Sequence, residues 1–382
     1  MSNKKIIFLS YRLGYDKLLY WDKILSYLKQ EYPKLRVFTA WKPLKTKDGS
    51  LETEYKLKGI KYYLNKNKIN QKLIFIPFPF FLRDIISYKP EIIILNEFNL
   101  ANFYVLVFKK LFFKKYKMIL LIENDPSIGF KEKNKENFFR KIYRKFFVNN
   151  VDLILTNNNL GKNYLLRLGV KSNKIVVKPY LTSFPDKNNI KNNDDIRNKR
   201  INILYVGQLI ERKGVIYLLK ALNNIKNKVK GKVVVNIVGD GVEKKLLIEY
   251  KNKTRLDFIQ FHGKIPFEKL HKFYNNADIF VLPTLYDYRA LVGFEALGYG
   301  CAILDSKFDG ARYEIVEEGK NGFIFNPINI DEFSKKILYL VENTTILDDY
   351  KKYSEKLSKK YTPKQCSENL IYTIKKALNE NT

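Results

Sequence analysis

The stretch LYVGQLIERKGVIYLLKAL, residues 204–222, holds the unit from which the fold can be predicted. It begins with a short apolar run that ends at Gly207, passes through a loop with Arg212 and Lys213, and reaches Gly214 before a segment of helical period. A short apolar run without polar alternation is typical of a strand that is covered on both faces. The stretch therefore predicts a strand, a loop and a helix that returns over a sheet.

Similar apolar runs recur along the whole chain and are separated by stretches of helical period. They are residues 6–10, 36–40, 73–77, 92–95, 118–122, 153–156 and 175–178, then 201–207, 233–239, 258–263, 279–283, 301–305 and 322–326. Alternating strands and helices predict an α/β protein with parallel sheets. The polar segment 183–200 divides the runs into two series, so we expect two doubly wound, Rossmann-like domains. Ligands would then bind beyond the carboxyl ends of the strands.

The charge of the chain is large and uneven. The 382 residues carry a net charge of +31, and residues 1–190 hold 37 Lys or Arg against 15 Asp or Glu, compared with 33 against 24 in residues 191–382. A strongly positive first half indicates an anionic partner, and we favour a membrane surface or a lipid phosphate over nucleic acid. Simple solvation of the lysines is the alternative.

The start of the chain and the cysteines bear on its location. Met1–Lys5 lead straight into the run at 6–10, which is too short for the apolar region of a secretory signal. The only two cysteines, Cys301 and Cys366, are too few for a disulfide framework and lack metal-ligand spacing. We expect a cytoplasmic protein.

Arg212 and Lys213 stand just before the helix that Gly214 opens. Cations are unfavourable at a helix N-terminus, which attracts anions. The arrangement is favourable if an anion binds there, because backbone N–H groups and both cations would converge on it. The alternative is a solvated basic loop with a glycine turn.

A second loop, in YDYRALVGFEALGYG at 286–300, carries two acids eight positions apart. Asp287 lies just before an expected helix and Glu295 lies about one turn inside it. The N–H groups of residues 289–291 would fall in the unpaired first turn and bind an anion between the two carboxylates, which are suited to sugar hydroxyls. Otherwise, Asp287 is a helix cap and Glu295 a surface residue.

With these motifs the second half of the chain resembles glycosyltransferase family 4, the retaining GT-B sugar-nucleotide transferases. The resemblance rests on YVGQLIERKG (205–214), IVGDG (237–241), FHG (261–263), ADIFVLP (277–283), the pair Asp287 and Glu295, EALGYG (295–300) and EEGKNGFIF (317–325). It covers about residues 200–330, and residues 1–180 share only the general layout. It implies an acceptor-binding domain at 1–185, a donor-binding domain at 200–363 and a final helix at 364–382 that packs back toward the first domain.

The resemblance also implies a role for each site residue. It places Asp287 on the hydroxyls of the donor sugar, Glu295 on the nucleotide ribose, and Lys213 on the pyrophosphate. Gln208 stands where the family commonly has arginine, and Arg212 would supply that charge. The catalytic residues would be Lys213, Arg212 and Asp287, and the donor site would also include Gly207, Gln208, Arg289, Ala290, Leu291, Val292 and Glu295.

Two loops of the first domain are candidates for acceptor binding. Glu123 and Asp125 follow the predicted strand at 118–122, and Arg12 and Gly14 follow the strand at 6–10. Asp125 is otherwise a turn residue before Pro126. No D-x-D motif occurs in the sequence, so we expect neither a metal nor a cofactor besides a UDP- or GDP-sugar donor.

Two basic, aromatic segments at 103–117 and 138–150 are typical of helices that lie on an anionic membrane. Core-facing helices with a solvated basic edge are the alternative. Together with the resemblance, which implies the retaining mechanism, the sequence predicts a metal-independent glycosyltransferase that is peripheral on the inner face of the membrane. Its expected acceptor is a lipid-linked glycan in surface polysaccharide or glycolipid synthesis. The same donor chemistry on DNA or a soluble acceptor remains an alternative, as does a non-catalytic, transferase-like subunit.

Overall fold

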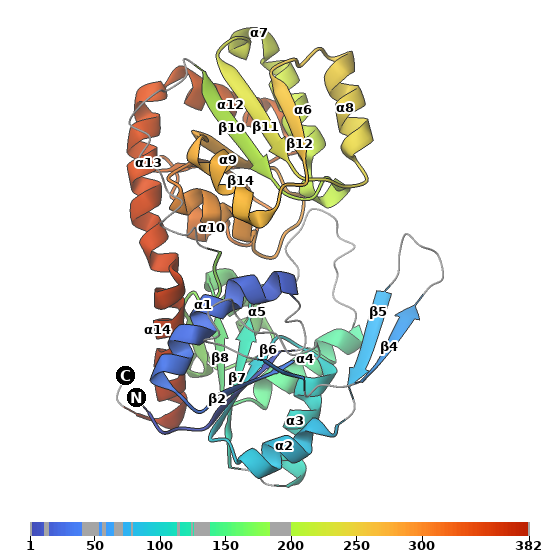
Figure 1. Ribbon diagram of the computed structural model, residues 1–382, viewed down its shortest axis with the longest axis vertical. Helices are drawn as coiled ribbons and strands as arrows, with labels where there is room; N and C mark the ends of the chain where they lie inside the picture. The colour runs from blue at the N-terminus through green and yellow to red at the C-terminus, as the bar shows by residue number, and fades with distance from the viewer. Residues whose placement is uncertain are drawn as a thin grey trace. The chain divides into compact units, whose positions relative to one another are not determined.

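The chain divides into two compact units, each built around a parallel sheet (Figure 1). The computed structural model describes residues 2–10, 15–39, 53–55, 59–64, 72–77, 79–112, 115–123, 125, 138–183 and 200–380. The first unit consists of Met1–Asn124, Glu136–Thr182 and Pro363–Thr382, and the second of Asp125–Lys135 and Ser183–Thr362. Most of the predicted linker, residues 184–199, lies outside the described residues.

The first unit has a parallel sheet in the order β3-β2-β1-β6-β7-β8-β9. Its strands are β1 Ile6–Ser10, β2 Leu35–Thr39, β3 Thr53–Tyr55, β6 Ile92–Asn96, β7 Lys117–Ile122, β8 Leu153–Thr156 and β9 Ile175–Val177. Its helices are α1 Tyr15–Glu31, α2 Phe81–Tyr88, α3 Leu100–Leu111, α4 Phe138–Asn149, α5 Asn159–Arg167, the short η2 Ser172–Lys174 and α14 Pro363–Leu378. The last helix is tied to this unit by a hydrogen bond of 2.7 Å from the Asn369 side chain to the Pro179 carbonyl.

One apolar run of the first half does not join this sheet. Residues 73–77 lie in β5, Lys72–Pro77, which pairs antiparallel with β4, Gly59–Leu64. Antiparallel neighbours can be joined by a short connection, whereas a parallel partner requires a crossover of a dozen or more residues. Only seven residues separate β4 from β5, so the antiparallel pairing follows from the connection.

The second unit has a six-stranded sheet in the order β12-β11-β10-β13-β14-β15. Its strands are β10 Ile201–Val206, β11 Val233–Val238, β12 Ile259–Gly263, β13 Ile279–Leu282, β14 Ala302–Ser306 and β15 Gly322–Phe325. Its helical segments are η4 Glu211–Lys213, α6 Val215–Asn224, α7 Lys226–Val229, α8 Lys244–Lys253, η5 Phe267–Lys269, α9 His271–Asn275, α10 Leu291–Gly298, α11 Arg312–Ile315, α12 Ile330–Glu342, α13 Thr344–Ser358 and η6 Lys359–Tyr361.

The strand order reverses between β10 and β13, which pair directly with each other. In an open parallel sheet this reversal is the topological switch point, where the loops after the two strands diverge and ligands bind. Here those loops are residues 207–214 and 283–290, the two loops that the sequence marks by their charged residues. The α/β class with two doubly wound units that the sequence predicts is confirmed.

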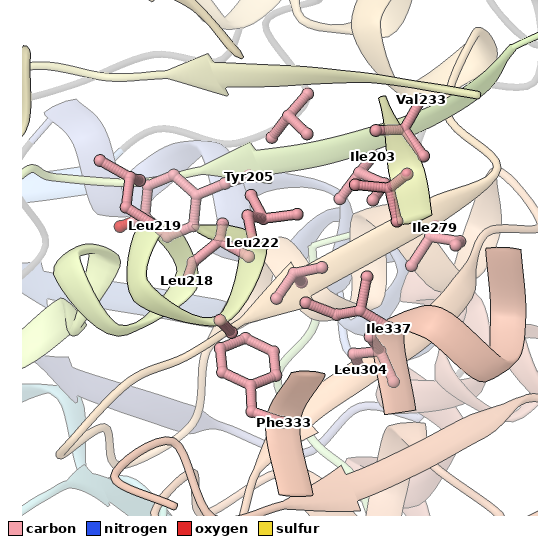
Figure 2. Close-up of a cluster of buried hydrophobic side chains, with 14 of the residues drawn as sticks. Ile203, Tyr205, Leu218, Leu219, Leu222, Val233, Ile279, Leu304, Phe333 and Ile337 are labelled. Carbon is pink, nitrogen blue, oxygen red and sulfur yellow. The ribbon is translucent and has the colours of Figure 1, made fainter. Parts of the chain in front are cut away.

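The sheet of the second unit is covered by apolar helix faces. Leucines of α6 pack with β-branched residues of the strands and with α12 in one buried cluster (Figure 2). The side chains drawn and labelled there are Ile203, Tyr205, Leu218, Leu219, Leu222, Val233, Ile279, Leu304, Phe333 and Ile337. All of them are buried, which explains why the strand runs show no polar alternation.

This packing predicts a large difference between two leucines on helices of the second unit. Leu219 is fully buried and Leu246 is 51% exposed. We expect Leu219→Ala to lower the free energy of unfolding by about 2–5 kcal/mol, because it leaves a cavity. Leu246→Ala should change it by less than about 0.5 kcal/mol. Urea unfolding followed by circular dichroism measures both, and equal losses would contradict the assignment of the α6 face to the core.

Candidate active site

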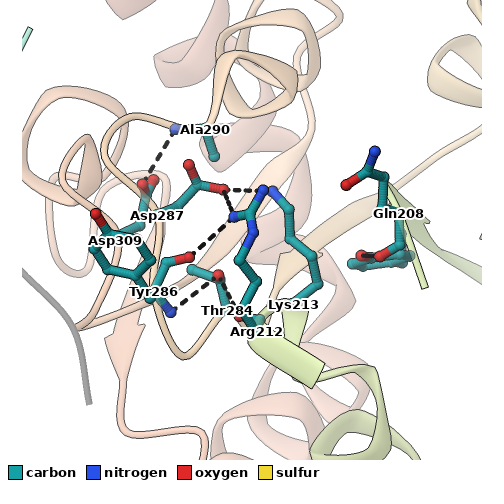
Figure 3. Close-up of polar contacts among 9 residues, drawn as sticks. Gln208, Arg212, Lys213, Thr284, Tyr286, Asp287, Ala290 and Asp309 are labelled. Carbon is teal, nitrogen blue, oxygen red and sulfur yellow. Dashed lines mark hydrogen bonds and ion pairs between the residues drawn. The ribbon is translucent and has the colours of Figure 1, made fainter. Parts of the chain in front are cut away.

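Two loops at the switch point are tied to each other through the carbonyl of Arg212. This carbonyl accepts a hydrogen bond from the Leu285 N–H at 2.8 Å. It accepts another from the Thr284 hydroxyl at 2.9 Å (Figure 3). Loop 207–214 follows β10 and loop 283–290 follows β13, so the bonds join the carboxyl ends of two neighbouring strands. The side chains of both loops are thereby brought to one place.

Gly214 allows this close approach. Its φ is +65°, and a Cβ atom at this position would lie 2.1 Å from the carbonyl oxygen of Pro283. A side chain is therefore excluded both by the left-handed backbone and by the neighbouring strand end. α6 begins at the next residue, Val215, so the glycine fixes where the helix starts relative to β13.

The three predicted catalytic residues form one ionic cluster. The Lys213 ammonium pairs with Asp287 Oδ2, and the Arg212 guanidinium lies 3.3 Å from the same oxygen and 3.1 Å from the Tyr286 carbonyl (Figure 3). The side chains of Lys213 and Asp287 are 12% and 15% exposed, whereas that of Arg212 is 43% exposed. The cluster is thus partly buried, with its arginine toward solvent.

The start of α10 differs from the sequence-based expectation in one amide. The N–H of Ala290 donates to Asp309 Oδ1 at 3.1 Å, so it is occupied (Figure 3). Among the described residues, the N–H groups of Leu291 and Val292 have no such acceptor, and they are the free amides of the first turn. Ala290 has φ −74° and ψ 99°, an extended rather than helical conformation, and an alanine adopts this negative φ without strain.

Arg289 is held in a buried ion pair with Glu314. Its Nε and Nη2 donate to both carboxylate oxygens at 2.7–3.1 Å, and the two side chains are 1% and 5% exposed. The guanidinium also lies over the Phe294 ring, 4.0 Å from its centroid. The side chain of Arg289 is therefore committed to Glu314 and points to a structural role.

Glu295 lies inside the unit. It is 4% exposed and accepts hydrogen bonds from the Tyr274 hydroxyl at 2.8 Å and from the Ser183 hydroxyl. Burial raises the pKa of this carboxyl, and the two hydrogen bonds oppose the rise. Both carboxylate oxygens accept hydrogen bonds from hydroxyl groups. A nucleotide ribose, the ligand predicted for Glu295, would offer donors of the same kind.

Two further acids, Asp305 and Asp309, lie near Asp287 and are not among the residues that the sequence predicts for the site. Both are fully buried, and among the described residues both carboxyl oxygens of Asp305 and Oδ2 of Asp309 have no hydrogen-bond partner. The backbone of Asp309 also pairs with that of Asp287, through the Asp287 N–H to the Phe308 carbonyl and the Gly310 N–H to the Asp287 carbonyl. Asp305 ends the run 301–305 and Asp309 follows it four residues later, and two acids at the carboxyl end of a strand were a signal that pointed to this place.

The environment of these acids favours their protonated forms. Burial, followed by the charge of Asp287, raises the pKa of Asp309 to about 7, while Lys213 opposes the rise. Burial and Asp309 raise the pKa of Asp305 well above its ordinary value, while Arg312 opposes the rise. A proton between the two carboxyl groups removes the repulsion between them.

The other predicted residues lie around this cluster or in the first unit, except Asp125, which belongs to the second unit and not to the first domain as the sequence predicts. A Cβ atom on Gly207 would lie 2.7 Å from the Tyr205 hydroxyl, which donates to the Gln208 carbonyl at 2.9 Å. The Gln208 side chain is exposed and lies apart from Asp287 in Figure 3. Glu123 follows β7, and Asp125 is 7% exposed. Arg12 and Gly14 lie outside the described residues.

The described ranges contain neither a metal-binding cluster nor a membrane-spanning helix. Within them, no three His, Cys, Asp or Glu side chains are grouped so that they could hold a metal ion. Within them, no helix combines the length and the apolar character that are needed to cross a bilayer.

The fold and this site define a class of protein. Solved structures with the same fold include sucrose-phosphate synthase from Thermosynechococcus elongatus, with a TM-score of 0.76 and 16% identity over 98% of this chain and 99% of that one. Another is the Anabaena protein HepE in complex with UDP, with a TM-score of 0.72 and 15% identity over 97% of this chain and 100% of that one. At such identities the likeness shows the fold alone, and that fold is GT-B.

The sequence comparisons are more specific. Residues 186–357 match the family Glycosyl transferases group 1, so they form a domain of this group in a chain of the GT-B glycosyltransferase superfamily. An uncharacterized glycosyltransferase of Methanocaldococcus jannaschii is 28% identical over 256 residues, 64% of either chain. The lipopolysaccharide 1,2-N-acetylglucosaminetransferase of Salmonella typhimurium is 26% identical over 202 residues, 50% of this chain and 52% of that protein. The chain thus matches less than two thirds of the length of these relatives.

The ion pair behind α10 predicts a marked loss of stability. Glu314→Ala leaves the buried Arg289 cation without its partner, and we expect it to lower the free energy of unfolding by about 3–5 kcal/mol. The double variant Arg289→Leu with Glu314→Leu removes both charges and should be much closer to the wild type. Urea unfolding of both variants tests this, and a double variant as unstable as Glu314→Ala would contradict it.

The buried acids predict a specific dependence of stability on pH. Because their pKa values are raised in the folded state, folding binds a proton, and this contribution is present below the ordinary Asp pKa and is lost as the pH rises toward 7. We expect the wild type to lose up to roughly 1.4 kcal/mol of unfolding free energy per pH unit from this proton. Asp305→Asn should flatten the slope, because its amide donates a hydrogen bond to Asp309 at every pH.

Urea unfolding at pH 5, 6, 7 and 8 measures how the free energy of unfolding changes with pH. Only the difference in this slope between the wild type and Asp305→Asn is assigned to the acid pair. Asp257→Asn, at an exposed aspartate of the same unit, is the matched control and should keep the wild-type slope. Parallel curves for the wild type and Asp305→Asn would contradict the shared proton.

Proposed function

We propose that the chain is a retaining, metal-independent glycosyltransferase of the family 4 type that transfers a sugar from a UDP- or GDP-sugar. The observation that carries this proposal is the cluster of Lys213, Arg212 and Asp287 at the switch point of the second unit. It is supported by the match of this unit to Glycosyl transferases group 1. In this proposal, residues 200–363 bind the donor, 1–185 bind the acceptor and 364–382 pack on the first domain.

The first step is binding of the donor diphosphate. The N–H groups of Leu291 and Val292 and the cations of Arg212 and Lys213 are the available donors on the two loops. A diphosphate would compete with Asp287 for both cations, and the released carboxylate would then accept hydrogen bonds from hydroxyls of the donor sugar. The same donors stabilise the charge that develops on the leaving diphosphate, an effect of roughly 3–4 kcal/mol for a single donor.

The nucleoside is assigned to Glu295. A ribose hydroxyl that replaces the Ser183 hydroxyl would keep this buried carboxylate hydrogen-bonded, so the exchange leaves neither carboxylate oxygen without a partner. Gly207 and Gln208, at the end of β10, complete the proposed donor site.

The chemical step follows from the proposed family. In a retaining transfer the acceptor attacks the anomeric carbon from the face that the diphosphate leaves, and a leaving phosphate oxygen takes the acceptor proton. Lys213 and Arg212 hold that phosphate, and Asp287 fixes the sugar. No protein nucleophile is required in this scheme, in contrast to a retaining hydrolase.

The proposed acceptor is a lipid-linked glycan in surface polysaccharide or glycolipid synthesis, reached at the inner face of the membrane. Two relatives support this class: the Salmonella lipopolysaccharide transferase and the amylovoran biosynthesis glycosyltransferase AmsK of Erwinia amylovora, 27% identical over 192 residues. Arg12, Gly14, Glu123 and Asp125 are the residues proposed for acceptor binding. The basic first half of the chain would face the anionic lipids.

The test is nucleotide binding, measured by thermal unfolding with UDP, GDP, ADP, CMP and their sugar conjugates, each with and without EDTA. A ligand at about 100 times its dissociation constant should add roughly 2.7 kcal/mol of stability. We expect one nucleotide to raise the melting temperature and EDTA to leave that rise unchanged. No rise with any nucleotide would instead favour a non-catalytic subunit, and a rise that EDTA abolishes would contradict metal independence.

Two variants separate the roles of the cluster. Lys213→Gln should weaken both the nucleotide and its sugar conjugate about ten- to hundredfold, because a charge-assisted hydrogen bond to phosphate is worth about 1.5–3 kcal/mol. Asp287→Asn should weaken the sugar conjugate but not the free nucleotide. Lys228→Gln, an exposed lysine of the same unit, is the control. Calorimetric titration measures the affinities, and equal loss of both ligands in Asp287→Asn would contradict the sugar contact.

A further inference from the structure

Helix α4 of the first unit has two apolar faces. Phe147 and Val148 are buried in the hydrophobic core of that unit, as expected of a helix on a sheet. Four other large apolar residues of the helix are exposed: Phe138 by 69%, Phe139 by 77%, Ile142 by 50% and Phe146 by 42%. Packing against the core explains the apolar face with Phe147 and Val148, but it does not explain the exposed apolar face.

The end of α3 extends the exposed apolar area. Leu111 and Phe112 are 67% and 58% exposed at the end of this helix. The two helices are in contact, because the Phe103 and Phe146 ring centroids lie 6.4 Å apart and the Lys110 ammonium lies 5.2 Å from the Phe146 centroid. We call the following residues the α3–α4 surface: Leu111, Phe112, Phe138, Phe139, Ile142 and Phe146.

Cations lie among these apolar residues. Lys110, Arg140, Lys141 and Lys145 are exposed, and neither helix contains an aspartate or glutamate. Exposed apolar side chains next to cations, without acids, are complementary to a bilayer with an anionic surface, where rings and aliphatic groups enter the acyl boundary and long cationic side chains reach the phosphates. A patch of such large exposed side chains marks an interaction site on a protein surface.

We propose that the α3–α4 surface binds an anionic lipid bilayer, with Phe138, Phe139 and Ile142 inserted and with Arg140, Lys141 and Lys145 at the lipid phosphates. This inference deepens the proposed function, since it names the surface by which a lipid-linked acceptor would be approached. The binding itself involves only the first unit and lipid. It can therefore be tested without nucleotide, sugar or acceptor.

The experiment is flotation of the full chain with vesicles of phosphatidylcholine alone and with vesicles that also contain phosphatidylglycerol. We expect retention on the anionic vesicles, weaker retention on the neutral ones and a decrease with added salt, since a Debye length of about 8 Å at physiological ionic strength screens exposed charges. Arg140→Gln, Lys141→Gln and Lys145→Gln together should lower the partition coefficient by about fivefold for each cation removed. Phe138→Ser, Phe139→Ser and Ile142→Ser together should abolish retention.

Matched controls come from exposed residues of the second unit. Lys228→Gln, Lys230→Gln and Lys232→Gln together remove the same charge, and Val242→Ser with Leu246→Ser removes exposed apolar side chains. Both should bind vesicles as the wild type does. All changed positions are exposed, and an unchanged unfolding midpoint for each variant verifies that it is folded.

Three results would overturn the proposal. The first is equal retention on neutral and anionic vesicles, and the second is an equal effect of the α3–α4 and the control variants. The third is a wild-type dimer in solution that the serine variants convert to a monomer with no change in lipid binding, because the surface would then be an interface between copies of this chain. Failure of nucleotide binding would overturn the proposed function and leave the lipid result as it stands.

Discussion

The contact between the start of α6 and the end of β13 is the constraint on which the site depends. Gly214 lies so close to the Pro283 carbonyl that no side chain fits, and the neighbouring Arg212 carbonyl accepts two hydrogen bonds from the β13 loop. Adjacent strands of a parallel sheet always bring their carboxyl ends together, but they do not fix the loops that follow. Here a glycine and one carbonyl oxygen fix them, and the Lys213–Asp287 pair forms as a consequence.

The second feature of the site is the number of ionisable groups buried around α10. Arg289 is paired with Glu314, Glu295 accepts hydrogen bonds from two hydroxyl groups, and the raised pKa of Asp309 favours its neutral, protonated form. Buried charges are costly unless each is paired or neutralised, so these groups restrict how the helix can be placed. The free amides of Leu291 and Val292 are therefore presented by a helix whose position is defined from several sides.

The sequence predicted the fold and the cluster of charged loop residues for one reason. Strand runs and loop charges can be recognised in short stretches of sequence. Because the two loops at the switch point of a parallel sheet flank one ligand site, their charged residues are predicted to lie close together, as Lys213 and Asp287 do. Partners that are distant in sequence gave no comparable signal. The occupation of the Ala290 amide by Asp309, the pairing of Arg289 with Glu314 and the Ser183 contact of Glu295 all depend on tertiary packing. The β4–β5 hairpin was missed because an apolar run alone does not show whether its partner is parallel.

The sequence leaves two interpretations open for the basic aromatic segments at 103–117 and 138–150: a helix on an anionic membrane, or a core-facing helix with a solvated basic edge. The structure distinguishes the two segments. Ala101, Val105, Leu106 and Phe108 of α3 are buried, and Phe103 and Tyr104 pack partly buried against the same core, so this helix is core-facing with a basic end. In α4 the core takes only Phe147 and Val148, and the larger apolar share is exposed beside Arg140, Lys141 and Lys145. A solvated basic edge requires no exposed phenylalanines, since water does not stabilise them. Part of the positive charge of the first half therefore lies beside exposed apolar side chains on α4. A general enrichment of the chain in lysine would not produce this combination.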